Sequence, residues 1–70
     1  MQINTGSRLR ELRRERGLTQ REVAEKIGIS YGAYAMYEIN ERVPRDDVKV
    51  RISKLFDKPV GYIFFGETLT

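Results

Sequence analysis

Seventy residues are enough for one domain, and a domain of this size buries only about 60% of its unfolded surface. The sequence contains neither cysteine nor histidine, which excludes disulfides, zinc sites and imidazole-based catalysis. A net charge of +3 permits nucleic-acid binding without requiring it, and no apolar run approaches the roughly 20 residues of a membrane span. We therefore expect a cytoplasmic protein without a metal, cofactor, small-molecule ligand or membrane contact.

The first helix is predicted over residues 5–16, with Asn4 or Thr5 as its N-cap and Gly17 at its end. Its inward-facing positions are Leu9, Leu12 and Arg13. The other arginines alternate with glutamates and indicate either a solvated, salt-bridged surface or one or two phosphate contacts: Arg8, Arg10, Arg14 and Arg16.

A capping box opens the second predicted helix, residues 19–27. The side chain of Thr19 can accept a hydrogen bond from the N–H three residues on, and Glu22 can accept one from the N–H of Thr19. Apolar residues then recur at helical spacing: Val23, Ala24 and Ile27. Gly28 suits the positive φ at which a chain leaves a helix.

Ser30 is a favourable N-cap for a third helix, predicted over residues 30–39. Tyr34 and Tyr37 point to one side of this helix, with Glu38 beside them. Two short helices joined by a tight bend form a helix-turn-helix, whose second helix can protrude as a unit into a DNA major groove.

A loop over residues 40–45 leads to a fourth helix over 45–56, and a fifth is predicted over 59–65. Pro44 prepares the start of the fourth helix, where two acids suit the helix dipole: Asp46 and Asp47. The apolar side of the fourth helix consists of Val48, Ile52, Leu55 and Phe56. The core candidates of the fifth helix are Val60, Ile63 and Phe64.

With these elements in place, the chain resembles the helix-turn-helix domains of phage lambda-type repressors and Cro, the Xre-like family of bacterial regulators. The matching residues are Arg13, Gly17, Leu18, Thr19, Gln20, Ala24, Gly28, Ile29, Ser30, Tyr37 and Glu38, followed by Pro44, the apolar run in 48–56 and residues 60–66. Tyr34 departs from the pattern, since the family usually carries Ile or Val there. The resemblance implies an all-α, compact five-helix bundle of the lambda-repressor-like type, forming a single domain over residues 1–70.

The resemblance also implies roles for individual residues. Base contacts are expected from the third helix: Tyr31, Gly32, Ala33 and Met36. Contacts with the DNA backbone are expected from Thr19, Gln20, Arg42 and Arg45. A structural ion pair is expected between Arg13 and Glu38, and a dimer interface is expected from the last helix: Tyr62, Phe64 and Phe65.

None of the four base-contacting candidates has the end group that reads guanine or adenine through two hydrogen bonds. Tyr31 can use its hydroxyl, Gly32 lets the backbone approach closely, and two apolar side chains can pack on thymine methyls: Ala33 and Met36. We therefore expect sparse direct readout biased toward thymine methyls, with DNA shape supplying part of the specificity. A protein–protein patch is an alternative use of Tyr31 and Met36.

The leading interpretation is a sequence-specific DNA-binding transcriptional regulator, a dimeric repressor whose recognition helices read a palindromic operator through the major groove. Its expected partners are double-stranded DNA and a second copy, in the nucleoid of a bacterium or a phage-infected cell. The alternative is a helix-turn-helix module for protein contact, such as an antitoxin or antirepressor.

Some residues also have a simpler explanation. Packing of the fifth helix on the first accounts for the aromatic residues of the fifth helix without a dimer, and exposed loop positions account for Arg42 and Arg45 without DNA. We expect no enzyme, because neither a catalytic residue set nor a phosphate-binding glycine loop is present.

Overall fold

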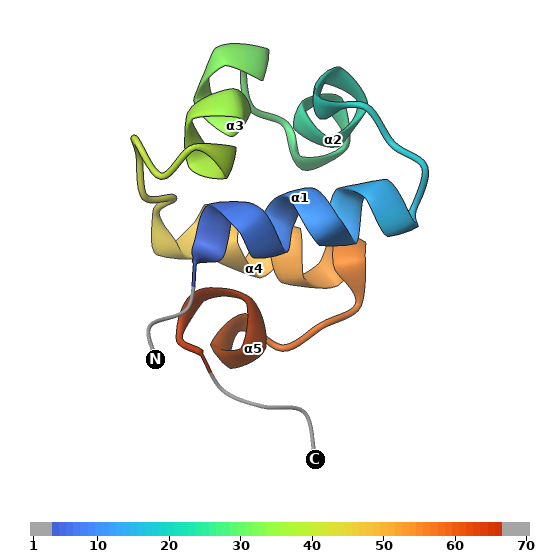
Figure 1. Cartoon of the computed structure of the whole chain (residues 1–70). Coiled ribbons are helices and arrows are strands. Elements are labelled where there is room, and N and C mark those ends of the chain that lie inside the picture. Colours follow the sequence, from blue (N-terminus) through green and yellow to red (C-terminus); the bar gives the residue numbers. More distant parts are fainter. Residues whose placement is uncertain (1–3, 67–70) are drawn as a thin grey trace.

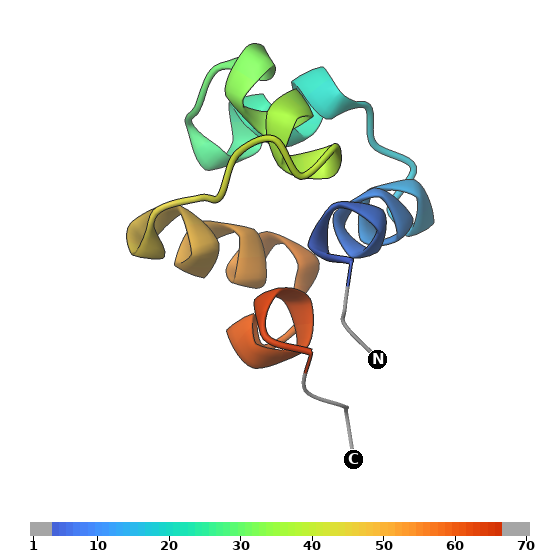
Figure 2. The same ribbon diagram turned by 60° about the vertical axis from the view of Figure 1, so that its left-hand side comes forward.

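The computed structural model describes residues 4–66. Over this range the chain forms five helices and no strand: α1 (Thr5–Glu15), α2 (Gln20–Ile27), α3 (Tyr31–Glu38), α4 (Asp46–Phe56) and α5 (Val60–Phe64). In Figure 1, α2 and α3 lie above α1 and α4, and α5 lies below them. The turned view in Figure 2 keeps the same three levels, so α1 and α4 separate the α2–α3 pair from α5. The all-α, five-helix fold expected from the sequence is confirmed. No helix within the described range is long and apolar enough to cross a membrane.

The predicted ranges exceed the observed helices by one residue at one or both ends, because they include the capping residues. The observed N-caps of the last four helices are Thr19, Ser30, Arg45 and Pro59. The N-cap of α1 is Asn4, whose side chain accepts a hydrogen bond from the Ser7 N–H at 3.0 Å.

Side-chain caps fix the first turns of both α2 and α3, and a short connection joins the two helices. The Thr19 hydroxyl accepts from the Glu22 N–H at 3.1 Å, and the Glu22 carboxylate accepts from the Thr19 N–H at 2.8 Å, which completes the predicted capping box. Gly28 ends α2 with φ 74°. The Ser30 hydroxyl then caps α3 by accepting from the Ala33 N–H at 3.1 Å. These local bonds give α3 a defined direction relative to α2.

Apolar side chains from all five helices form one core: Leu9, Leu12, Val23, Ala24, Ile27, Tyr34, Tyr37, Val48, Ile52, Phe56 and Ile63. Three predicted core residues lie only partly buried at its edge: Leu55, Val60 and Phe64. Of the three core candidates predicted for α5, Ile63 is fully buried, Phe64 packs against the core while partly buried, and Val60 is partly buried. A helix of five residues makes only about one and a half turns, so it directs one side chain, Ile63, fully into the core.

Arg8 within α1 and Arg16 at its C-cap tie this helix to the ends of other helices. Arg8 donates from Nη1 to the Tyr62 carbonyl at 2.7 Å, and its guanidinium carbon lies 4.0 Å from the centroid of the Tyr62 ring. Arg16 donates to the Phe56 carbonyl, the last of α4, at 2.9 Å. Carbonyls in a last helical turn lack intrahelical donors, so a guanidinium from a neighbouring helix satisfies them. The alternating charge pattern of α1 did not predict these interhelical bonds.

Candidate nucleic-acid interface

The outer surface of α3 faces solvent. Tyr31 is 44% and Met36 is 45% exposed, and Gly32 lies open, since a Cβ placed there would meet nothing within 4 Å in the described chain beyond its chain neighbours and the nearby backbone of α3. Ala33 is half-buried and packs against the core. The structure thus places three of the four predicted base-contacting residues on open surface and the fourth at its margin. Their contact with bases stays a prediction.

The inner surface of α3 is sealed. Tyr34 is 0% exposed, and its ring meets that of Tyr37 edge to face, with centroids 6.2 Å apart. The Tyr34 hydroxyl is buried without a hydrogen-bond partner in the described part of the chain. Burial, followed by the nearby Glu38 carboxylate, raises the pKa of this phenol far above its usual value, so the hydroxyl stays neutral. Tyr34, which departs from the family pattern, is therefore a core residue.

Glu38, the last residue of α3, is 2% exposed and binds two other helices. Arg13 of α1 donates to its carboxylate twice, from Nε to Oε2 at 2.7 Å and from Nη2 to Oε1 at 3.1 Å. Gln20, at the start of α2, donates from Nε2 to Oε1 at 3.0 Å. Arg10 adds a longer ionic contact, with Nε 3.7 Å from Oε1. The structure thus brings the predicted partners Arg13 and Glu38 together within a wider polar cluster.

Both members of this buried pair are charged. Burial acts to raise the pKa of Glu38, but hydrogen bonds from Arg13 and Gln20 outweigh it and hold that pKa below its usual value. The hydrogen bond with Glu38 is the largest cause of a raised pKa for Arg13. Because the guanidinium also donates to the Leu18 carbonyl at 3.0 Å, it links α1, the α1–α2 loop and α3. This arrangement fixes the base of α3 against the rest of the molecule.

A second polar clamp lies just beyond α3. Asn40 adopts a left-handed conformation, with φ 62°. Its Oδ1 accepts from the Gly6 N–H at 3.0 Å, and its Nδ2 donates to Asn4 Oδ1 at 2.8 Å. Gly6 lies so close to α3 that a Cβ on it would collide with the Glu38 carbonyl. The two helices therefore meet backbone to backbone where the chain leaves α3.

The start of α2 carries two predicted backbone contacts, Thr19 and Gln20, and both are hydrogen-bonded within the protein. The backbone N–H of Thr19 is the largest cause of a lowered pKa for Glu22, which keeps this carboxylate ionised at the helix N-terminus. Gln20 directs its amide to Glu38. The next residue, Arg21, was not predicted as a contact, and its guanidinium carbon lies 4.6 Å from the centroid of the Tyr31 ring.

The remaining predicted backbone contacts lie in the loop from α3 to α4. Arg42 is exposed, and the Arg45 side chain is 84% exposed, with its Nε 3.7 Å from Asp47 Oδ1. Exposure of this degree leaves both guanidinium groups accessible to a phosphate, and their role stays a prediction.

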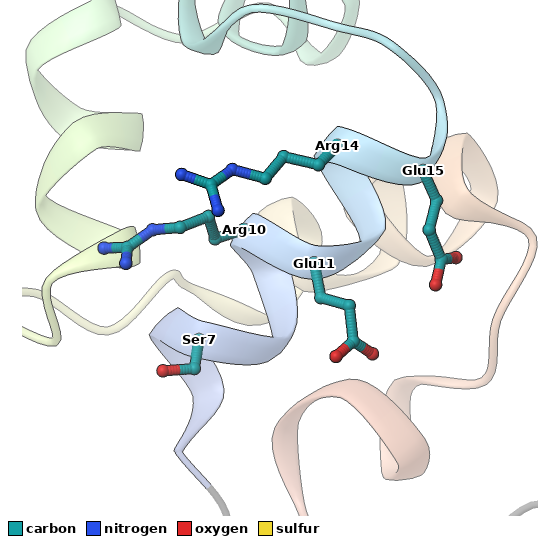
Figure 3. A pocket seen from close by; sticks show the side chains of 5 residues that line it. All are labelled: Ser7, Arg10, Glu11, Arg14 and Glu15. Carbon is teal, nitrogen blue, oxygen red and sulfur yellow. The ribbon is translucent and has the colours of Figure 1, made fainter.

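The side chains of α1 separate by charge around an open hollow lined by Ser7, Arg10, Glu11, Arg14 and Glu15. Figure 3 shows Arg10 and Arg14 extending toward α3, whereas Glu11 and Glu15 point toward α5. The basic side of α1 therefore adjoins the helix whose outer surface is open.

The predicted dimer residues lie on α5 and directly after it. Tyr62 and Phe64 are half-buried, whereas Phe65 is 63% exposed. Lys49 of α4 lies beside both phenylalanines, with its Nζ 5.7 Å from the Phe64 ring centroid and 5.0 Å from that of Phe65. A cavity of about 250 Å³ opens between these rings and the loop after α3. Phe65 is thus the most exposed of the three predicted dimer residues, and its contact with a second copy stays a prediction.

Comparisons with known proteins cover most of this chain. A helix-turn-helix family model matches residues 9–63. The HTH-type transcriptional regulator YobD of Bacillus subtilis is 43% identical over 56 residues, which make up 80% of this chain and 50% of that protein. The HTH-type transcriptional regulator ImmR, also of Bacillus subtilis, is 34% identical over 61 residues, 87% of this chain and 48% of that protein.

A phage protein is similar as well. The cryptic phage CTXphi transcriptional repressor RstR of Vibrio cholerae is 35% identical over 55 residues, 79% of this chain and 50% of that repressor. The chain thus spans about half the length of these relatives. No solved structure matches it significantly.

Proposed function

The chain belongs to the helix-turn-helix family of transcriptional regulators, and we propose that it is a dimeric repressor that binds a palindromic operator through the DNA major groove. One observation carries this proposal. The outer surface of α3 is open to solvent, while its inner surface is buried and its last residue is fixed by Arg13 and Gln20. A helix held in this way can enter a groove without reorganisation of the domain.

The exposed side chains of α3 determine what kind of readout is available. The Tyr31 hydroxyl can donate a hydrogen bond to a base edge or accept one from it, and the Met36 side chain can pack on a thymine methyl. Open space around Gly32 allows the α3 backbone to approach the groove closely. Direct readout is then sparse, and the deformability of the DNA contributes to the choice of operator.

Basic side chains near α3 supply the contacts with the DNA backbone. Arg42 and Arg45 follow α3 on the exposed loop, and Arg14 extends from α1 toward α3. Each phosphate that a guanidinium neutralises adds about 0.9 to the slope of log K against log salt concentration. Two or three such contacts therefore predict a slope of about −2 to −3 for each copy.

The α5 region forms the contact between copies in this proposal. Phe65 is exposed beside a cavity of about 250 Å³, and packing of the two Phe65 regions against each other covers apolar surface on both copies. In this proposal the two α3 helices of the pair occupy half-sites about 34 Å apart, one turn of B-DNA. An operator read in this way is palindromic.

Selection of binding sites from random-sequence duplexes tests the proposal directly. The expected result is a palindromic consensus whose footprint covers two half-sites, bound by two copies as measured by analytical ultracentrifugation. The affinity falls steeply between about 50 and 200 mM salt. Weak retention of all sequences, with no consensus, would contradict it.

An alternative use of α3 is supported by the apolar character of its outer surface. Met36, Ile39 and Val43 are 45%, 57% and 76% exposed along α3 and the loop after it. A module that binds another protein, such as an antitoxin or antirepressor, buries residues of this kind. In that case Met36→Glu abolishes binding to the protein partner, and no duplex sequence is selected.

A further inference from the structure

The first turns of α2 and α3 are joined by a stacked pair of side chains. The guanidinium carbon of Arg21 lies 4.6 Å from the centroid of the Tyr31 ring. Both residues are exposed, and Tyr31 retains 44% of its surface. Within the described range, no hydrogen bond or ion pair holds the Arg21 guanidinium, so the Tyr31 ring is its defining contact.

The neighbours of Arg21 are engaged elsewhere. The Thr19 hydroxyl and N–H are both used in the capping box, and the ionised Glu22 carboxylate occupies the N-terminus of α2. The Gln20 amide donates to the buried Glu38. At this end of α2, Arg21 is therefore the side chain with cationic donors directed to solvent.

The chemistry of a stacked guanidinium suits it to a second partner. Stacking uses the flat face of the group, and its N–H donors lie around the edge, where they match two oxygens of a phosphate. We propose that Arg21 and Tyr31 act as one DNA-contacting unit, in which Arg21 binds a backbone phosphate and orients the Tyr31 ring toward the bases. This inference rests on the proposed DNA-binding function.

The pair also changes what Tyr31 contributes. An exposed tyrosine at the first position of a helix samples several rotamers, whereas a ring covered on one face by a guanidinium loses part of that freedom before DNA arrives. A pre-oriented ring presents its hydroxyl to the groove at a lower entropic cost on binding. Tyr31 is then a positioned contact, and Arg21 is both a phosphate contact and its positioning residue.

A double-mutant cycle on the selected operator tests this unit with Arg21→Ala, Tyr31→Ala and the double variant. Arg21→Ala should reduce the salt slope by about one unit for each copy bound. The double variant should bind about two- to five-fold more tightly than independent effects predict, because the stack is already lost in either single variant. Arg21→Lys should keep most of the salt slope, since it keeps the charge, and should show less coupling with Tyr31.

Lys54→Ala is the matched control, because it removes one exposed positive charge from α4, below α2 and α3 in Figure 1. It should leave both the salt slope and the affinity nearly unchanged. Thermal melts should show that all variants are folded, since Arg21 and Tyr31 are surface residues.

The outcomes separate this inference from the function on which it rests. If the wild-type chain selects no DNA sequence, the proposed function fails. If it binds an operator while Arg21→Ala retains the wild-type salt slope, or while the cycle is additive, the Arg21–Tyr31 unit is overturned and the proposed function stands.

Discussion

The two ends of α3 are held by different kinds of contact. At its C-terminal end, Glu38 is buried among Arg13, Gln20 and Arg10, and Asn40 binds the start of α1. At its N-terminal end, the Ser30 cap and the stacked Arg21 are both exposed to solvent. The contrast indicates that the direction of α3 is set at its base, while its tip is left accessible.

A buried ion pair is suited to setting direction. Removing two charges from water offsets much of the attraction between them, so the intact pair contributes little net stability. A double hydrogen bond between a planar guanidinium and a carboxylate nevertheless allows only a narrow range of geometries. The ion pair therefore fixes the orientation of α3 at its C-terminal end, whereas an apolar contact of equal size would leave that orientation less defined.

Removal of the Glu38 carboxylate at the C-terminal end of α3 should have the largest effect on stability. Glu38→Ala leaves Arg13 buried without its counter-ion, because that side chain is only 14% exposed. We expect a loss of about 3 to 5 kcal/mol in the free energy of unfolding, measured by urea denaturation. A small domain has little stability beyond this amount, so we expect part of the Glu38→Ala population to be unfolded even without urea. Glu25→Ala, at an exposed glutamate of α2, is the control and should change stability by less than about 0.5 kcal/mol. Equal losses in the two variants would contradict the assignment.

Acid should reversibly weaken the same ion pair at the C-terminal end of α3. The pKa of Glu38 is lower in the folded protein than its ordinary value of 4.5, so its contribution is complete above pH 4.5 and is lost as the pH falls through the folded pKa. The stability difference between the wild type and Glu38→Gln should therefore shrink between about pH 6 and about pH 3. Urea midpoints at the two pH values measure it. Glu22 also has a lowered pKa and leaves some acid sensitivity in the variant. A difference that stays constant with pH would show that Glu38 does not titrate in this way.

The close approach of α1 and α3 can be tested with a pair of glycines. Gly6→Ala forces a methyl group into the Glu38 carbonyl, so α1 and α3 must separate, at a cost of about 1 to 3 kcal/mol. The methyl group of Gly32→Ala meets no other element of the described chain within 4 Å, and alanine should stabilise the N-terminal end of α3 by about 0.5 to 1 kcal/mol through its higher helix propensity. Thermal melts of both variants give the comparison. If both substitutions raised the melting temperature, or both lowered it, the proposed difference between the two ends of α3 would be disproved.

The side chain of Asn40 should contribute the smallest of these effects. Asn40→Gly keeps the left-handed backbone and removes the bonds to Gly6 and Asn4, so we expect a loss of about 0.5 to 1.5 kcal/mol. Asp57→Gly is the matched control at φ 53°, because the Asp57 side chain makes no hydrogen bond with any other residue between positions 4 and 66. It should be neutral or slightly stabilising. Chemical denaturation of the two variants separates loss of the clamp from relief of backbone strain, and a gain in stability for Asn40→Gly would exclude the clamp.

Local features of the fold could be predicted from the sequence. The capping box, the positive φ of Gly28 and the Ser30 cap depend on residues within four positions of one another, and all three are present in the structure. The pairing of Arg13 with Glu38 came from the family resemblance, since 25 residues separate the two. Local propensity contains no signal for such a pair.

Long-range contacts account for what the sequence did not predict. Arg8 bonds to a carbonyl 54 residues away, and Arg16 bonds to one 40 residues away. A guanidinium can reach so many acceptors that only the packed helices decide between them. The stack of Arg21 on Tyr31 follows equally from the angle between α2 and α3. Gln20 binds Glu38, because the first turn of α2 lies against the C-terminal end of α3, and its contact with DNA stays a prediction.

The arginines of α1 also limit what formal charge can say about this protein and its homologues. Of thirteen positive side chains, four donate hydrogen bonds to acceptors on other parts of the fold: Arg8, Arg13 and Arg16 from α1 and its C-cap, and Arg51 from α4. Exchange of any of them for lysine leaves the isoelectric point almost unchanged, yet a lysine lacks the rigid fork that spans these gaps. Homologues with equal isoelectric points can therefore differ in how their helices are braced, and alignments that treat the two residues as equivalent overlook it.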